Sequence, residues 1–243
     1  MTSEGSNAAV PNLPPQVADH ELLRRVGTGA YGDVWLARSV TGILRAVKVV
    51  WRRNFDHDRT YEREFAGLRK FEPLSRRHDG LVDILHIGRN DEAGYFYYVM
   101  ELADDASAST PAAVADYVPL TLAELLRQRG RLLAGECART GAAVADALAF
   151  LHGEGLIHRD IKPSNLIFVG GHPKLADIGL VVGVGEARSF VGTEGYIPPE
   201  GPGSVQSDLF SLGRVLYEMA TGKSRHEFPV APPRTPDPGK FQT

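Results

Sequence analysis

Cysteine is almost absent from this sequence of 243 residues, in which Cys137 is the only one. A single thiol forms neither an internal disulfide nor a zinc site built from several thiolates, which is typical of proteins of the reducing cytoplasm. No apolar run approaches the roughly 18 residues of a transmembrane helix, and residues 1–20 lack the basic start and apolar core of a signal peptide. We therefore expect a cytoplasmic protein without direct membrane insertion.

An excess of charge of either sign is also missing. The chain has 27 Lys and Arg against 30 Asp and Glu, for a formal net charge of -3. This balance gives no reason to expect nucleic acid or an anionic membrane surface as the main partner. With 43% hydrophobic residues, the composition excludes collagen-like and disordered proteins and fits one large domain or two joined lobes.

Composition divides the chain into four parts. Residues 1–16 are small, polar and interrupted by proline, and residues 229–243 contain five prolines, so we expect a flexible tail at each end. Residues 17–103 hold β-branched and aromatic runs between turn residues, with one helix at about 58–72. Residues 104–228 begin with an Ala-, Ser- and Asp-rich stretch and continue mainly as helices. This order predicts an α+β fold in two lobes.

Two helices of the second lobe are recognisable from periodicity. Apolar or small residues from Leu133 to Leu151 repeat every three or four positions, which places them on one stripe of a long helix. Residues 208–220 form a second helix with apolar side chains on most faces. A helix of that kind is usually buried, so we expect it in the core.

Residues 27–34 read GTGAYGDV, a GxGxxG pattern in which missing side chains let backbone amides approach phosphate oxygens. A dinucleotide-binding fold requires a helix at the third glycine, but the sequence continues from Val34 as a strand. The glycines therefore belong to a hairpin. Taken alone, they are equally well explained by a tight turn without any ligand.

Two charged residues follow this hairpin. Lys48 lies in the next strand, in AVK, and Glu64 lies on the helix at about 58–72. A lysine on a strand and a glutamate on a helix can pair across the lobe and place a cation near phosphate. The alternative is that both are ordinary solvated surface charges.

The segment HRDIKPSN, residues 158–165, lies on a loop after the long helix. Asp160, Lys162 and Asn165 offer a carboxylate for a hydroxyl proton, a cation for a phosphate and an amide for a metal ion. Asp177 begins the triplet DIG, and its carboxylate suits Mg²⁺ bound to phosphate oxygens. This set of residue types predicts phosphoryl transfer.

Together these motifs resemble the catalytic domain of eukaryotic-type (Hanks-type) protein kinases, most closely the bacterial Ser/Thr members. Over about residues 20–220, the matching segments stand in the family's order: GTGAYGDV, AVK, Glu64, HRDIKPSN, DIG, PPE and the helix beginning SDLFSLG. The resemblance implies a bilobal kinase-like fold with a small β-rich lobe and a mainly helical lobe. It also implies transfer of the ATP γ-phosphate to protein Ser or Thr hydroxyls, including autophosphorylation.

For ATP, the resemblance implies that the glycines and Lys48 contact the phosphates, with Lys48 paired to Glu64. Apolar residues would sandwich the adenine ring, Met100 would stand at the gatekeeper position, and the backbone of residues 101–103 would receive adenine. The implied ATP-binding residues are Gly27, Gly29, Gly32, Val34, Ala46, Lys48, Met100, Glu101, Ala103 and Ile167.

For catalysis, the resemblance implies that Asp160 accepts the hydroxyl proton and that Lys162 stabilises the transferring phosphoryl group. Asn165 and Asp177 would hold Mg²⁺. Thr193, in GTEGY, matches the threonine that contacts the catalytic Asp and Lys in Ser/Thr kinases. The implied catalytic set is Asp160, Lys162, Lys48, Glu64 and Thr193.

Two further features are carried over from the family. Four residues match the stacked apolar column that the family anchors on Asp208: Leu68, Ile84, His158 and Ile178. Arg159 matches an arginine that often clamps a phosphorylated activation loop, for which Ser189 is the best candidate site.

The sequence also departs from the family. Ile178 replaces the usual Phe of DFG, and Pro198 replaces the Ala of APE. The 25 Pro-rich residues after Glu218 do not continue through the family's last helices, so we expect an incomplete helical lobe without the usual arginine partner of Glu200. Arg225 and Arg234 are the only later arginines. We expect a tail, a second copy or a partner chain to cover the apolar surface left exposed.

Three functions remain open at this point. The first is an ATP- and Mg²⁺-dependent protein Ser/Thr kinase. The second is a nucleotide-binding pseudokinase or scaffold module, or an incomplete kinase fragment, with little turnover. The third is a small-molecule kinase, against which Lys162 and the segment GTEGYIPPE argue.

Overall fold

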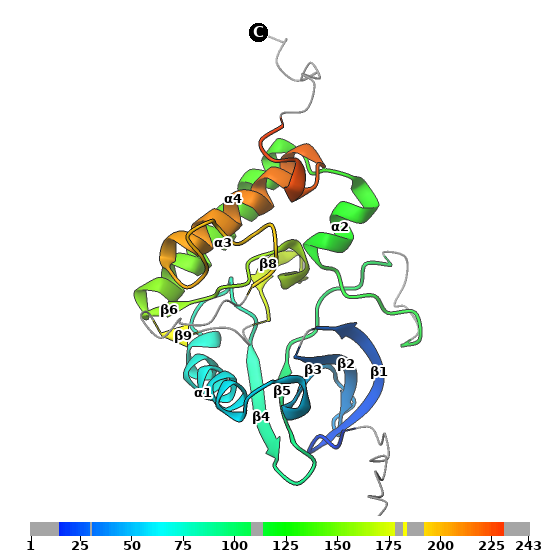
Figure 1. The fold of residues 1–243 in the computed structure, drawn as a ribbon. Helices are drawn as coiled ribbons and strands as arrows, with labels where there is room; N and C mark the ends of the chain where they lie inside the picture. Colours follow the sequence, from blue (N-terminus) through cyan, green and yellow to red (C-terminus); the bar gives the residue numbers. More distant parts are fainter. Residues whose placement is uncertain (1–14, 30, 108–113, 178–181, 184–191, 231–243) are drawn as a thin grey trace, which may run out of the picture.

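The computed structural model describes residues 15–29, 31–107, 114–177, 182–183 and 192–230. Figure 1 shows two lobes, one formed by a sheet with helix α1 and the other by helices α2, α3 and α4. The described part of the chain therefore has the predicted α+β, bilobal arrangement. Among the described residues, no helix is long and apolar enough to cross a membrane.

The first lobe is built on an antiparallel sheet of five strands in the order β1-β2-β3-β5-β4. Its strands are β1 (His20–Thr28), β2 (Gly32–Ser39), β3 (Leu44–Trp51), β4 (Ile84–Asn90) and β5 (Tyr95–Met100). Ala46 pairs with Met100, and Lys48 pairs with Tyr98. The β3–β5 pairing thus places two implied ATP-binding residues opposite each other near the lobe boundary.

Helix α1 (Asp58–Ser75) packs on one face of this sheet. Its buried residues Leu68 and Phe71 join Phe96 of β5 in the main core, whereas Tyr97 belongs to a smaller cluster of outer-sheet residues. The alternation along β5 is that of a strand buried on both faces. The helix expected at about 58–72 is confirmed and runs three residues further.

The second lobe contains α2 (Leu122–Arg129), α3 (Ala134–Gly153) and α4 (Val205–Thr221). On α3 the predicted stripe is buried at Cys137, Val144 and Leu148, but Leu133 precedes the helix and is 71% exposed. At Gly141 an added Cβ would lie 2.6 Å from Leu216 Cδ2. The missing side chain lets α3 and α4 approach closely.

The prediction that α4 is buried on most faces is wrong. Its buried apolar residues Leu212, Val215 and Met219 share one stripe, whereas Leu209 is 51% exposed. The helix packs against α3, and its remaining apolar residues are partly or largely exposed. The segment after α4 folds back on another face, where the ring of Phe228 meets that of Tyr217.

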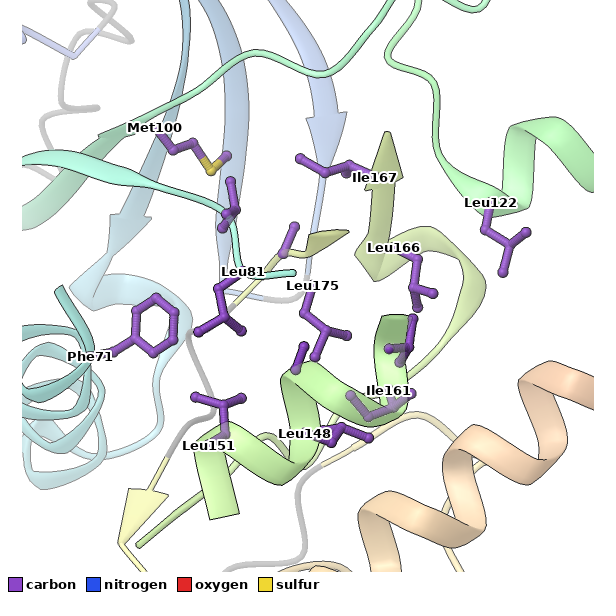
Figure 2. Close-up of a cluster of buried hydrophobic side chains, with 14 of the residues drawn as sticks. Phe71, Leu81, Met100, Leu122, Leu148, Leu151, Ile161, Leu166, Ile167 and Leu175 are labelled. Carbon is purple, nitrogen blue, oxygen red and sulfur yellow. The ribbon is translucent and has the colours of Figure 1, made fainter. Parts of the chain in front are cut away.

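Short elements lie between or after the longer helices and strands, and several of them carry the loops of the site. They are η1 (Arg52–Asn54), β6 (Leu156–Ile157), η2 (Pro163–Asn165), β7 (Leu166–Val169), β8 (His172–Leu175), β9 (Val182–Gly183) and η4 (Arg225–Glu227). One continuous hydrophobic cluster joins the lobes; Figure 2 shows Phe71 and Met100 of the first lobe with Leu148 and Leu175 of the second. The loops between these elements therefore rest on a shared core.

Candidate functional site

A cavity of about 280 Å³ lies between the lobes. All ten residues that the family resemblance implied for ATP line it: Gly27, Gly29, Gly32, Val34, Ala46, Lys48, Met100, Glu101, Ala103 and Ile167. Asn165 and Asp177, the expected Mg²⁺ ligands, lie in the same wall. A mostly apolar cleft with a few converging polar groups is the usual form of a small-molecule site.

The glycine-rich segment forms the expected hairpin above this cavity. The backbone N–H groups of Gly29 and Gly32 each donate to the other residue's carbonyl, at 2.8 and 3.4 Å. A Cβ at Gly32 would lie 2.0 Å from the Val49 carbonyl oxygen, whereas a Cβ at Gly27 meets only ordinary contacts at 3.5 Å. Gly32 is thus required by the close approach of β2 and β3, and Gly27 is not.

The partner of Lys48 differs from the prediction. Its ammonium group forms an ion pair with the carboxylate of Asp177, and among the described residues no Lys48–Glu64 ion pair is present. Burial lowers the pKa of Lys48, but the charges of Asp177, Tyr98 and Glu64 and the hydrogen bond to Asp177 together raise it above the usual range. Burial raises the pKa of Asp177, but Lys48, Lys162 and His158 together lower it below its usual value, so that carboxylate stays ionised.

Glu64 is only 5% exposed and lies near, but not paired with, these charges. Burial raises its pKa to about 7, although the charges of Arg63, Arg159 and Lys48 act in the opposite direction. The expected Lys48–Glu64 pair is therefore corrected to a Lys48–Asp177 pair beside a Glu64 carboxyl that is protonated more easily than usual.

The four remaining residues of the predicted catalytic machinery come together on one side of the cavity. Thr193 Oγ1 donates to Asp160 Oδ1 at 2.7 Å, and Lys162 Nζ donates to Thr193 Oγ1 at 2.8 Å. Lys162 Nζ also lies 2.8 Å from Asp160 Oδ2. Asn165 Nδ2 donates to the same carboxylate oxygen at 2.9 Å. Three side chains therefore contact the Asp160 carboxylate and determine its orientation.

A buried aspartate on α4 holds the backbone of this loop. The backbone N–H groups of His158 and Arg159 donate to the Asp208 carboxylate at 2.9 and 2.8 Å, and His152 Nε2 lies 2.9 Å from it. Asp208 is fully buried. Arg159 and Asp177 have positive φ angles, 72 and 58, which are uncommon for residues other than glycine and persist only where surrounding contacts hold them.

The donor set near Asp160 fits a hard cation. Asn165 donates its amide nitrogen to Asp160, so its side-chain oxygen could serve as a ligand, and Asp177, whose Oδ1 pairs with Lys48, could offer its second carboxylate oxygen. Among the described residues no group of three or more His, Cys, Asp or Glu gathers as a metal site. Two protein oxygens suit Mg²⁺, which keeps several waters and binds phosphate oxygens rather than a closed protein cage.

Sequence reasoning missed two tyrosines that line the cavity. Tyr98 lies opposite Lys48 on the paired strand, and burial raises the pKa of its phenol. It lies two residues before Met100, so the alternation of β5 was the available signal. Tyr117 donates its hydroxyl to the Ala103 carbonyl at 3.0 Å. It follows the Ala- and Ser-rich stretch, where the sequence has no periodicity to follow.

The boundary between the lobes is also fixed by charge. Lys174 Nζ of β8 contacts Glu101 Oε1 at 2.6 Å, and the backbone N–H of Asp83 donates to the same oxygen at 3.0 Å. Both charged side chains are largely buried. The Glu101 side chain is therefore tied down on the segment whose backbone was expected to receive adenine.

The remaining residues singled out in the sequence have different outcomes. Leu68, Ile84 and His158 are buried, as the column requires, but Ile178 and Ser189 lie outside the described residues. Arg225 reaches the carbonyl of Glu194, not the side chain of Glu200.

Comparison with known proteins identifies a family and several relatives of this chain. The sequence model of the protein kinase domain family matches residues 20–229. The serine/threonine-protein kinase AfsK of Streptomyces coelicolor is 34% identical over 220 residues, which are 86% of this chain and 25% of that protein. The chain thus spans about a quarter of the length of this relative.

Two other relatives extend the similarity. The probable serine/threonine-protein kinase PkwA of Thermomonospora curvata is 30% identical over 88% of this chain and 28% of its own length. The 3-phosphoinositide-dependent protein kinase 1 of Arabidopsis thaliana is 28% identical over 85% of this chain and 42% of its own length. The similarity covers both lobes.

Proposed function

Because this chain belongs to the protein kinase family, whose domain spans residues 20–229, we propose that it transfers the γ-phosphate of ATP to Ser or Thr hydroxyls of proteins, its own included. The observation that carries the proposal is the cluster of Asp160, Lys162 and Thr193 beside the interlobe cavity. It combines a carboxylate for a proton with a cation for a phosphoryl group.

In this function Asp160 orients the acceptor hydroxyl and accepts its proton. Lys162 offsets negative charge on the phosphoryl group during transfer, and Thr193 holds both side chains in place through its single hydroxyl. Because phosphoryl transfer depends mainly on positioning and electrostatics, a cluster fixed by hydrogen bonds is what the reaction needs.

ATP occupies the interlobe cavity in this proposal. The glycine hairpin and Lys48 contact its phosphates, and the apolar residues Val34, Ala46 and Ile167 enclose its base. Asn165 and Asp177 hold Mg²⁺, which neutralises phosphate charge when bound. The protein acts in the cytoplasm, where ATP is available and a lone thiol stays reduced.

One observation favours a second candidate function, a nucleotide-binding module with little turnover. Lys48 is paired with Asp177 and not with Glu64. The cation expected to bind phosphate and the carboxylate expected to bind Mg²⁺ therefore neutralise each other. In that case the chain binds ATP without transferring phosphate.

The test is phosphate transfer from labelled ATP with Mg²⁺ to the chain itself and to a general protein substrate, with mass spectrometry to locate the phosphate. Asp160→Ala should lower the rate roughly 10² to 10⁴-fold because it removes the general base. Asp116→Ala, at an exposed position outside the cavity, is the matched control. Transfer unaffected by Asp160→Ala would refute the assignment, and ATP binding without any transfer would favour the second candidate.

We also propose that a second copy or a partner chain covers apolar surface in the last part of the described chain. Leu209 on α4 is 51% exposed, and Phe228 and Val230, which follow that helix, are 45% and 53% exposed. Light scattering at several protein concentrations tests self-association, and a constant monomer mass would exclude a second copy and leave the chain's own tail or a different partner chain.

A further inference from the structure

A second cavity, of about 610 Å³, opens beside the catalytic cluster. It is bounded by α2, by the loop of Lys162, by Thr193 and Tyr196, and by the end of α4 with η4. Lys162 and Ser164 line both this cavity and the interlobe cavity, so the two meet at the catalytic cluster. We call the second cavity the acceptor groove, because an acceptor hydroxyl can reach Asp160 from it.

The charged residues of the acceptor groove are mostly basic: Arg127, Lys162, Lys223 and Arg225, against Glu218. Three of the four cations have a carboxylate nearby. Lys162 Nζ lies 2.8 Å from Asp160, an Arg127 guanidinium nitrogen lies 2.6 Å from Glu124, and Lys223 Nζ lies 3.7 Å from Glu227. Their charges are largely compensated within the protein.

Glu218 has the one carboxylate among the described residues that line the groove, and neutral donors bind it. Glu218 Oε2 accepts from the Tyr196 hydroxyl at 2.6 Å, and Oε1 accepts from the backbone N–H of Arg225 at 2.8 Å. Burial and the neighbouring Glu218 raise the pKa of Tyr196, so the phenol remains a donor. Both Glu218 oxygens therefore accept hydrogen bonds from the protein itself.

Arg225 is held in a defined position, and its guanidinium forms no ion pair with a carboxylate of the described residues. Its Nε donates to the Glu194 carbonyl at 2.9 Å, and its guanidinium lies 4.9 Å from the centre of the Tyr196 ring. In the part of the chain that the structure describes, no carboxylate lies within 4.0 Å of its charged nitrogens.

The Arg225 side chain lies directly against the backbone of Gly195. Gly195 has a φ of 85, and a Cβ there would lie 2.6 Å from Arg225 Nε and 2.7 Å from its Cδ. Only glycine combines this φ with room for the arginine side chain. A guanidinium fixed in this way loses little conformational freedom when it binds a carboxylate through two N–H groups.

We propose that the acceptor groove recognises protein segments that carry an Asp or Glu side chain close to the acceptor Ser or Thr, with Arg225 as the residue that binds this carboxylate. The proposal rests on the proposed kinase function. Glu194, which Arg225 contacts, follows Thr193, which contacts Asp160. Since residues of an extended segment are spaced about 3.3 Å apart, the carboxylate belongs within about three residues of the acceptor.

The direct test measures binding, so it does not depend on turnover. Fluorescent peptides with one Ser acceptor, carrying either Asp or Asn at the flanking positions, are titrated by anisotropy in the presence of a non-hydrolysable ATP analogue. The unaltered chain should bind the Asp peptides about five- to tenfold more tightly, and added salt should reduce the difference. Equal binding of Asp and Asn peptides overturns the proposal without any variant.

Variants then identify the residue. Arg225→Gln should abolish the preference, and Arg225→Glu should shift it to peptides with Lys at the same position. Arg139→Glu changes an exposed arginine of α3 that does not line the groove, and it should keep the preference for Asp. Circular dichroism establishes that the variants are folded. A preference that survives Arg225→Gln in a folded chain overturns the assignment to Arg225.

Phosphate transfer to the same peptides separates this proposal from the proposed function. Equal rates on Asp and Asn peptides would leave the kinase function intact and refute acidic recognition. Selective binding of Asp peptides without transfer to any peptide would refute the kinase function and leave the recognition intact.

Discussion

Glu64 is a carboxyl group in surroundings that disfavour its charge. Because burial raises its pKa from 4.5 to about 7, the folded protein binds a proton there more readily than the unfolded chain does. The stabilisation from this proton is fully present below the unfolded pKa and is lost as the pH rises through about 7. This direction is opposite to that of an ion-paired glutamate.

We predict that lowering the pH from 8 to 5 stabilises the unaltered chain relative to Glu64→Gln by about 2 to 3 kcal/mol, since glutamine mimics the protonated carboxyl and does not titrate. Urea unfolding of both chains at each pH measures the difference. Glu62→Gln, at an exposed neighbour on α1 that contacts Arg89, is the control. A constant difference between Glu64→Gln and the unaltered chain would contradict the raised pKa.

At the scale of elements, Gly27 and Gly32 both belong to the GxGxxG motif but have different surroundings in the hairpin. Gly32 faces the Val49 carbonyl of the neighbouring strand, whereas Gly27 has room for a methyl group. The difference arises from the pairing of β2 with β3, which places Gly32 opposite Val50. Backbone oxygens of a paired strand cannot move without breaking the ladder.

We predict that Gly32→Ala lowers the free energy of unfolding by roughly 1 to 3 kcal/mol, because the methyl group must displace β3. Gly27→Ala, in the same segment and without a close contact, should change it by less than about 1 kcal/mol. Denaturant unfolding of the two variants provides the comparison. Equal losses would show that flexibility of the segment matters and not the contact with Val49.

At the scale of the whole molecule, the catalytic loop depends on a helix about 50 residues further along the chain. Asp208 accepts the backbone N–H groups of His158 and Arg159 and ties α4 to the loop that carries Asp160. A charged acceptor bonded to two buried donors stabilises more than a neutral one. Folding of the helical lobe and placement of the catalytic residues are therefore coupled.

We predict that Asp208→Ala costs roughly 3 kcal/mol or more of stability, because it leaves two buried N–H groups without an acceptor. Asp208→Asn keeps one acceptor oxygen and should cost less. Thermal unfolding measures both losses, and hydrogen exchange of the loop amides shows whether the loop opens first. If Asp208→Asn and Asp208→Ala lower the stability equally, the stabilisation by Asp208 does not come from its hydrogen bonds with the two N–H groups.

The sequence by itself determined which residues gather at the site. The motifs GTGAYGDV and AVK supplied six of the ten cavity-lining residues, and HRDIKPSN and DIG supplied Asp160, Lys162, Asn165 and Asp177, because each motif combines a local backbone form with a required side chain. Met100, Glu101, Ala103, Ile167 and Thr193 came only from the resemblance to the kinase family. Strand alternation and helical spacing were likewise readable, since both are local periodicities.

Only the tertiary structure decided which of these side chains bind one another. Lys48 pairs with Asp177, 129 residues away, and not with Glu64; Leu209 lies at the surface of a helix whose composition suggested burial; and Arg225 lies over Gly195. Such contacts join segments that sequence periodicity cannot relate. Their outcome depends on distances of a few ångströms and on the balance between burial and charge pairing, which arise only when the lobes pack together.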